Sequence, residues 1–102
     1  MTTANWSRYR TIIEEPAASN SIEALSEAHE RFSDQWDGFV WLVARQPKEI
    51  SLKKTVGGVD YRLSHREGNA QYNLPDIAVI FLYDDDSVTI VDVSVWVLHK
   101  SE

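Results

Sequence analysis

The sequence predicts an α+β fold: an N-terminal strand, one or two helices and a three-stranded antiparallel meander, with the helices packed on one face of the sheet. Three observations predict it. Apolar residues recur at helical spacing through the first half of the chain, and β-branched and aromatic residues dominate two segments near the C-terminus. A short acidic triplet separates these two segments. The length of 102 residues, 43% of them apolar, suits a single domain spanning residues 1–102.

The first expected element is a short strand over Arg8–Glu15, which has β-forming residues at its centre and is followed by Pro16. Proline has no N–H to donate to a neighbouring strand, so strands bounded by it lie mostly at sheet edges. We therefore expect this strand at an edge of the sheet.

A helical segment over about 21–46 follows, and Pro47 ends it. Its apolar stripe has intervals of three and four residues and comprises Ile22, Leu25, His29, Phe32, Trp36, Phe39 and Val43. We expect Trp36, Phe39, Trp41 and Leu42 to be core residues, and His29 to be a core or boundary histidine.

The ends of this helical segment carry capping signals. Asn20 begins a capping-box pattern, and Ser19 and Ser21 are alternative caps. Ser33-Asp34 can cap a second helix, so one long helix and two helices with a break near Ser33 both fit the pattern.

The next expected strand is Val59–Arg66, which follows a tight turn at Gly57-Gly58. Apolar residues alternate with polar ones along it, so Arg62, Ser64 and Arg66 share one side. A loop at Gly68–Pro75 then leads to the C-terminal hairpin.

The C-terminal hairpin comprises two apolar strands, Ile77–Tyr83 and Val88–Leu98, joined by the turn Asp84–Asp86. One side of the last strand carries Val91, Val93, Val95 and Val97, and we expect that side to face the core. The other side becomes polar toward its end, at Asp92, Ser94 and Trp96. We expect this polar side to share the face opposite the helix with the polar side of strand 59–66.

Composition narrows the function classes. The net charge of −6 argues against a nucleic-acid binder without sequence preference, although residues 45–74 carry six basic and three acidic side chains. There is no cysteine, and the N-terminus lacks a basic region followed by an apolar one. We expect a cytoplasmic protein that does not enter a membrane.

Motifs for phosphate loops, dinucleotides, zinc or a nucleophile elbow are missing from the sequence, and we expect neither a metal nor a cofactor. Asp84–Asp86 is interpreted as a solvated turn, because consecutive side chains at a hairpin tip point in different directions. A metal-independent nuclease would need an acid or base and cations near the phosphate. His65 and His99 can supply the acid and the base. The alternation along strand 59–66, however, puts His65 on the helix-covered side.

Four pieces of sequence resemble the RelE/ParE superfamily of toxin–antitoxin toxins, over residues 8–98. The first pieces are Trp41-Leu42-Val43-Ala44-Arg45-Gln46-Pro47 and Gly58-Val59-Asp60-Tyr61-Arg62-Leu63. The others are the strand residues 76–86, which end in Asp84-Asp85-Asp86, and Val88-Thr89-Ile90-Val91-Asp92-Val93. In this resemblance Ala78 stands where family members carry an arginine.

The resemblance implies a toxin neutralised by a cognate antitoxin, acting either as an endoribonuclease on mRNA at the ribosome or as an inhibitor of DNA gyrase. It points to catalytic roles for Arg62, His65, Arg66 and His99. The expected binding residues are Lys53, Lys54, Tyr72, Asp92, Ser94, Trp96 and Lys100. A homodimer is compatible with the sequence.

Two other functions stay open from the sequence. One is a ParE-like or catalytically inactive protein that works by binding, with Arg62 and Trp96 in its contact surface. The other is an acidic inhibitor or immunity-type module that masks a basic partner, which Asp84–Asp86 and the acidic helical segment favour.

Overall fold

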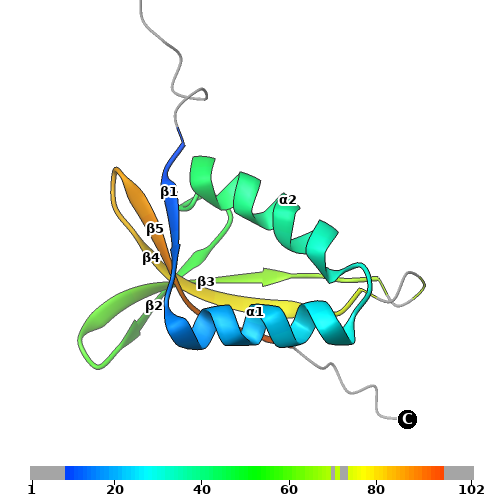
Figure 1. Cartoon of the computed structure of the whole chain (residues 1–102). Helices are drawn as coiled ribbons and strands as arrows, with labels where there is room; N and C mark the ends of the chain where they lie inside the picture. The colour runs from blue at the N-terminus through cyan, green and yellow to red at the C-terminus, as the bar shows by residue number, and fades with distance from the viewer. Residues whose placement is uncertain (1–8, 70, 72–73, 96–102) are drawn as a thin grey trace, which may run out of the picture.

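The computed structural model describes residues 9–69, 71 and 74–95 (Figure 1). A strand, two helices and then four further strands follow one another along the chain. They are β1 (Thr11–Glu14), α1 (Pro16–Ala28), α2 (Phe32–Arg45), β2 (Leu52–Val56), β3 (Val59–Arg66), β4 (Ile77–Tyr83) and β5 (Ser87–Val95). No helix among these residues combines the length and the apolar character that crossing a membrane requires.

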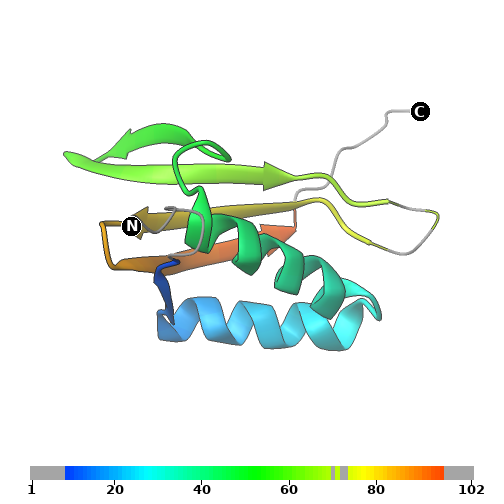
Figure 2. The ribbon, with the colours of Figure 1, turned by 90° about the horizontal axis from the view of Figure 1, so that it is seen from above.

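The strands form one five-stranded sheet in the order β1-β5-β4-β3-β2 (Figure 2). β1 pairs with β5 in parallel, and every other pair of neighbours is antiparallel. The α+β class and the edge position of the N-terminal strand are confirmed. The sheet is mixed, because β1 pairs with the last described strand and not with its neighbour in the sequence.

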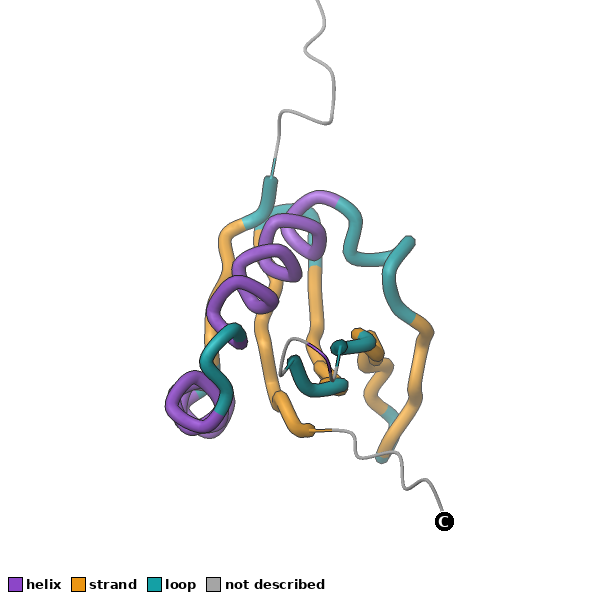
Figure 3. The backbone as a smooth tube through the Cα atoms, turned by 90° about the vertical axis from the view of Figure 1, so that its right-hand side faces the viewer, coloured by secondary structure: helices purple, strands orange, loops and turns teal. Residues whose placement is uncertain are grey.

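The core lies between the helices and one face of the sheet (Figure 3). The helices contribute Ala18, Leu25, Phe32, Trp36, Phe39 and Val43, and the strands contribute Ile77, Val79, Phe81, Val88, Ile90 and Val93. The rings of Phe32, Trp36 and Phe39 stack along α2, and Phe39 meets Phe81 edge-on with ring centroids 6.4 Å apart. The apolar stripe predicted for the helical segment is therefore the inner face of α1 and α2.

The helix boundaries differ from those expected. α1 begins at Pro16, with Glu15 as an N-cap that makes no side-chain cap bond, so the capping box at Asn20 is wrong. Proline suits the first turn because its fixed φ is helical and its missing N–H would have no helical partner. The segment breaks into two helices at His29, whose backbone is extended, and α2 begins at Phe32.

The meander has four strands, because β2 was missed in the sequence. All five residues of β2 are exposed, and they carry no apolar alternation to mark a strand. The strand exists through its antiparallel pairing with β3. Gly57 and Gly58 join the two strands with φ of 59° and 82°, the left-handed conformation that a tight two-residue hairpin turn requires.

A β-bulge divides β5 into two halves. Phe81 pairs with Ile90 but Ile80 pairs with Asp92, so β5 carries one extra residue at Val91. The bulge shifts the alternation by one residue, and both Ile90 and Val93 face the core. The prediction of a continuous valine core side is therefore wrong in part: Val93 is buried as predicted, but Val91 is half-buried, Val95 is exposed, and Val88 and Ile90 are buried.

Candidate functional site

The register of β3 places its polar side on the same face of the sheet as the helices. Arg62, Ser64 and Arg66 lie opposite Phe81, Val79 and Ile77, three core residues of β4. The prediction that these three polar residues share the face opposite the helix with Asp92 and Ser94 is therefore wrong. Alternation along one strand shows which residues share a side, but it does not show which side is covered.

The side chain of Arg62 is held by the connection between α2 and β2. Its Nε donates to the hydroxyl of Ser51 at 2.9 Å, and its Nη2 donates to the carbonyls of Ser51 and Lys48 at 2.9 and 3.2 Å. Beside it, buried Ser64 donates its hydroxyl to the carbonyl of Ile50 at 2.8 Å. Arg62 and Ser64 thus fasten this connection to the sheet.

His65 lies on the open face of the sheet, the face opposite the helices. Its neighbour across the pairing is Ala78, and beyond Ala78 lies Ser94. Two strand spacings put His65 and Ser94 roughly 10 Å apart. Asp92 joins them on this face, opposite Ile80. The expectation that His65 lies on the helix-covered side is therefore wrong. As for Arg62, the register of β3 with β4 decides which face the side chain is on.

The remaining predicted site residues fall into three groups. Lys53 pairs with Arg62 on the covered side and lies 4.0 Å from a carboxylate oxygen of Asp60, whereas Lys54 pairs with Tyr61 on the open side. Arg66 is half-buried at the end of β3. Tyr72, Trp96, His99 and Lys100 lie outside the described residues.

Asp84 organises the turn between β4 and β5, as the interpretation of residues 84–86 as a turn requires. Its Oδ1 accepts the backbone N–H groups of Asp86 and Ser87 at 2.8 Å each, and these two bonds lower the pKa of Asp84 below 3.8. In the part of the chain that the structure describes, no cluster of three or more His, Cys, Asp or Glu side chains could hold a metal ion.

Comparison of the chain with protein-family models, with curated proteins and with solved structures gives no match.

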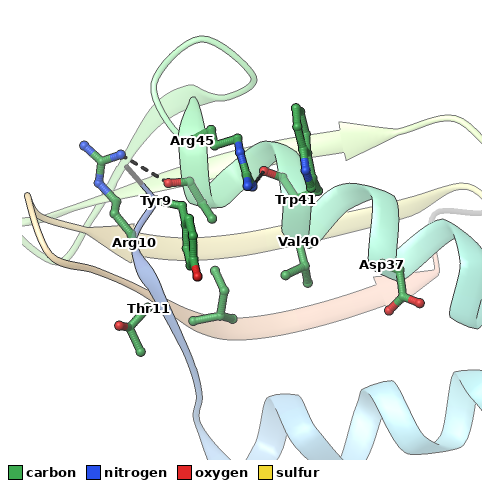
Figure 4. Close-up of a pocket in the computed structure, with 9 residues that line it drawn as sticks. Tyr9, Arg10, Thr11, Asp37, Val40, Trp41 and Arg45 are labelled. Carbon is green, nitrogen blue, oxygen red and sulfur yellow. Dashed lines mark hydrogen bonds between the residues drawn. The ribbon is translucent and has the colours of Figure 1, made fainter. Parts of the chain in front are cut away.

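A groove between β1 and α2 was missed in the sequence (Figure 4). It has a volume of about 440 Å³ and is lined by Tyr9, Arg10, Thr11, Ile12, Asp37, Val40, Trp41, Ala44 and Arg45. The side chains of Ile12 and Val40 form the apolar part of this lining, and Tyr9 and Trp41 add two aromatic rings to it. The lining residues come from two distant segments of the sequence, 9–12 and 37–45, so only the fold brings them together.

The rim of the groove carries a stack of two rings and a cation. The guanidinium carbon of Arg45 lies 4.1 Å from the ring centroid of Trp41 and 5.0 Å from that of Tyr9. Nη1 of Arg45 also donates to the carbonyl of Trp41 at 3.0 Å. Trp41 is 57% exposed, so its predicted place in the core is wrong. Its position between Phe39 and Val43, off the apolar stripe, was the signal for exposure.

Arg10 marks the end of the groove where β1 meets the last turn of α2. Its backbone N–H donates to the carbonyl of Ala44 at 3.0 Å. Its Nε donates to the carbonyl of Asp84 at 2.6 Å, and its guanidinium carbon lies 5.4 Å from the ring centroid of Tyr83. These contacts tie the segment that leads into β1 to both α2 and the β4–β5 turn.

Proposed function

We propose that the protein is a toxin-like component of a bacterial toxin–antitoxin pair, similar to the RelE/ParE superfamily, and that it acts by binding a protein target and not by cutting mRNA. The resemblance of the sequence pieces supports the first part, and so does the order of a strand, two helices and an antiparallel meander. The second part rests on one observation, the three hydrogen bonds that hold Arg62 to Ser51 and Lys48.

Cutting RNA without a metal requires cations that stabilise the charge on the phosphate in the transition state. Arg62 is one of the basic residues to which the resemblance assigns this role, and its guanidinium is engaged by the α2–β2 connection. Ala78, which pairs with His65 on the open face, stands where members of that family carry an arginine, and it supplies no charge. On that face, the described part of β3, β4 and β5 carries an imidazole at His65 and a carboxylate at Asp92.

Apolar side chains dominate this open face, which suits contact with a protein. Leu63 pairs with Ile80 across β3 and β4, and Leu82 follows Ile80 on the same side of β4. Tyr61 extends the row toward β2. A half-buried apolar sheet face of this kind is typical of surfaces that meet a partner.

Inducible expression in a bacterial host tests the proposal. We expect growth arrest with intact transcripts, together with inhibited gyrase if the target is the one that ParE-like toxins bind. Primer extension across abundant mRNAs measures cleavage. Cleaved transcripts would overturn the proposal that the protein acts by binding. The absence of growth arrest would overturn the toxin hypothesis and favour the acidic inhibitor module.

A nuclease remains the second candidate function, because His65 lies on the open face with Asp92 and Ser94. An imidazole there could move a proton to or from a bound ribose. In this case transcript cleavage would depend on His65 and not on Arg62.

A further inference from the structure

The groove between β1 and α2 lies apart from the open face of the sheet, and its chemistry points to a specific occupant. We propose that it binds an extended segment of a partner protein that runs along the free edge of β1, places an apolar side chain between Ile12 and Val40, and sets an acidic side chain on Arg45. The proposal does not depend on how the protein acts on its target.

The residue types at the groove are those that dominate protein–protein binding energy. Trp, Tyr and Arg are enriched among residues whose loss costs most in binding. Here the guanidinium of Arg45 lies over the rings of both Tyr9 and Trp41, and these two aromatic residues are 67% and 57% exposed. A segment that covers them would remove large apolar surfaces from water at little entropic cost, because the stack already orders the side chains.

The charge at the groove favours an acidic partner. Arg45 appears in neither of the two ion pairs found among the described residues, and the hydrogen bond that it donates to the carbonyl of Trp41 uses one of its five N–H groups. The rings on either side shield its guanidinium from water, which strengthens its attraction for a carboxylate. Arg10 adds a second positive charge at the same end, whereas Asp37 lies toward the other.

The backbone of β1 favours an extended segment. Thr11 donates its N–H to the carbonyl of Asp86, just before β5, and Glu15 donates its N–H to the carbonyl of Ile90 in β5, at 3.0 Å each. Strand alternation therefore directs the N–H of Ile12 away from β5, on the same side as the N–H of Arg10, which reaches the carbonyl of Ala44 in α2. A partner strand along this edge would find a backbone donor next to the apolar groove.

Selection of random displayed peptides against the full chain provides the probe. We expect enriched peptides to carry Asp or Glu within two positions of a large apolar residue. A synthetic peptide with the enriched sequence should then shift the backbone amide signals of residues 9–12 and 37–45 in NMR titrations. Enrichment without this pairing, or signal changes confined to the open face of the sheet, would overturn the proposal.

Substitutions at the rim sharpen this test. Trp41→Ala and Arg45→Gln should each weaken peptide binding by about tenfold or more, since both side chains are hot-spot types. Arg45→Glu should prefer the same peptide with its acid replaced by lysine. Arg31→Gln, at the N-cap of α2 and so at the end of that helix away from Arg45, is the matched control and should bind as the unchanged chain does. Thermal unfolding of each variant shows that it is folded, and unchanged binding by Trp41→Ala and Arg45→Gln would refute the site.

Discussion

On the helix-covered face of the sheet Arg62 and Ser64 are held by the chain itself, whereas on the open face His65 and Asp92 stand on either side of β4. α2 repeats this contrast within one element. Trp36 is 6% exposed in the core, and Trp41, a little more than one turn later, is 57% exposed beside the groove. The same residue type thus stabilises the fold on one side and offers a contact surface on the other, and the side decides its role.

The largest test of this contrast replaces neighbouring residues of β4 that point to opposite faces. Phe81→Ala should lower the free energy of unfolding by about 3–5 kcal/mol, because Phe81 is fully buried and meets the ring of Phe39. Leu82→Ala, on the half-buried open side, should cost less than half as much. Urea unfolding followed by circular dichroism measures both. Equal losses would mean that the open face is covered as thoroughly as the other.

Arg62→Ala is the next largest test, because it separates a structural from a catalytic arginine. The change leaves the carbonyls of Lys48 and Ser51 without their donor, and we expect a loss of about 1–3 kcal/mol in unfolding free energy. Lys54→Ala, exposed on β2, should stay within about 0.5 kcal/mol of the unchanged protein. An Arg62→Ala variant that is fully stable but loses activity would return this residue to the catalytic role.

The elements that the sequence predicts best are those with a strong periodic pattern. The stripe from Leu25 to Val43 is the inner face of the helices, and the apolar run of β4 is a central strand. β2 escapes this reasoning because its stability comes from pairing with β3 and not from its own residues. Pro16 was interpreted as the end of a strand, and it is also the first residue of α1.

The candidate sites were harder to predict because they depend on relations between elements. The side of β3 that carries Arg62 is set by its register with β4, and the alternation of β3 alone misleads, because its apolar side with Tyr61 and Leu63 lies on the open face. The bulge at Val91 moves the core side of β5 by one residue without a clear sign in the sequence. The stack of Tyr9 on Arg45 joins two segments that only the fold makes neighbours.

Substitution of Asp84 tests the turn between β4 and β5 without changing a residue on either face of the sheet. The pKa of Asp84 is lower in the folded protein than in the unfolded chain. The carboxylate therefore stabilises the fold at pH values above its unfolded-state pKa, and this stabilisation is lost as the pH falls through its folded-state pKa. Unfolding free energies measured from pH 6 to pH 2.5 should therefore fall less steeply for Asp84→Asn. Asp85→Asn, which leaves the two N–H bonds of the turn in place, is the control. An equal change in slope for both variants would contradict this account.

His65→Ala should have the smallest effect on stability and the most informative effect on function. His65 is exposed at the end of β3, so its removal should lower the free energy of unfolding by less than Arg62→Ala does. If the protein acts by binding, transcripts stay intact during expression of both His65→Ala and the unchanged chain. If it is a nuclease, the unchanged chain cleaves transcripts and His65→Ala loses this cleavage while remaining folded. Because the variant keeps the covered face intact, loss of cleavage would reflect chemistry on the open face and not a loss of structure.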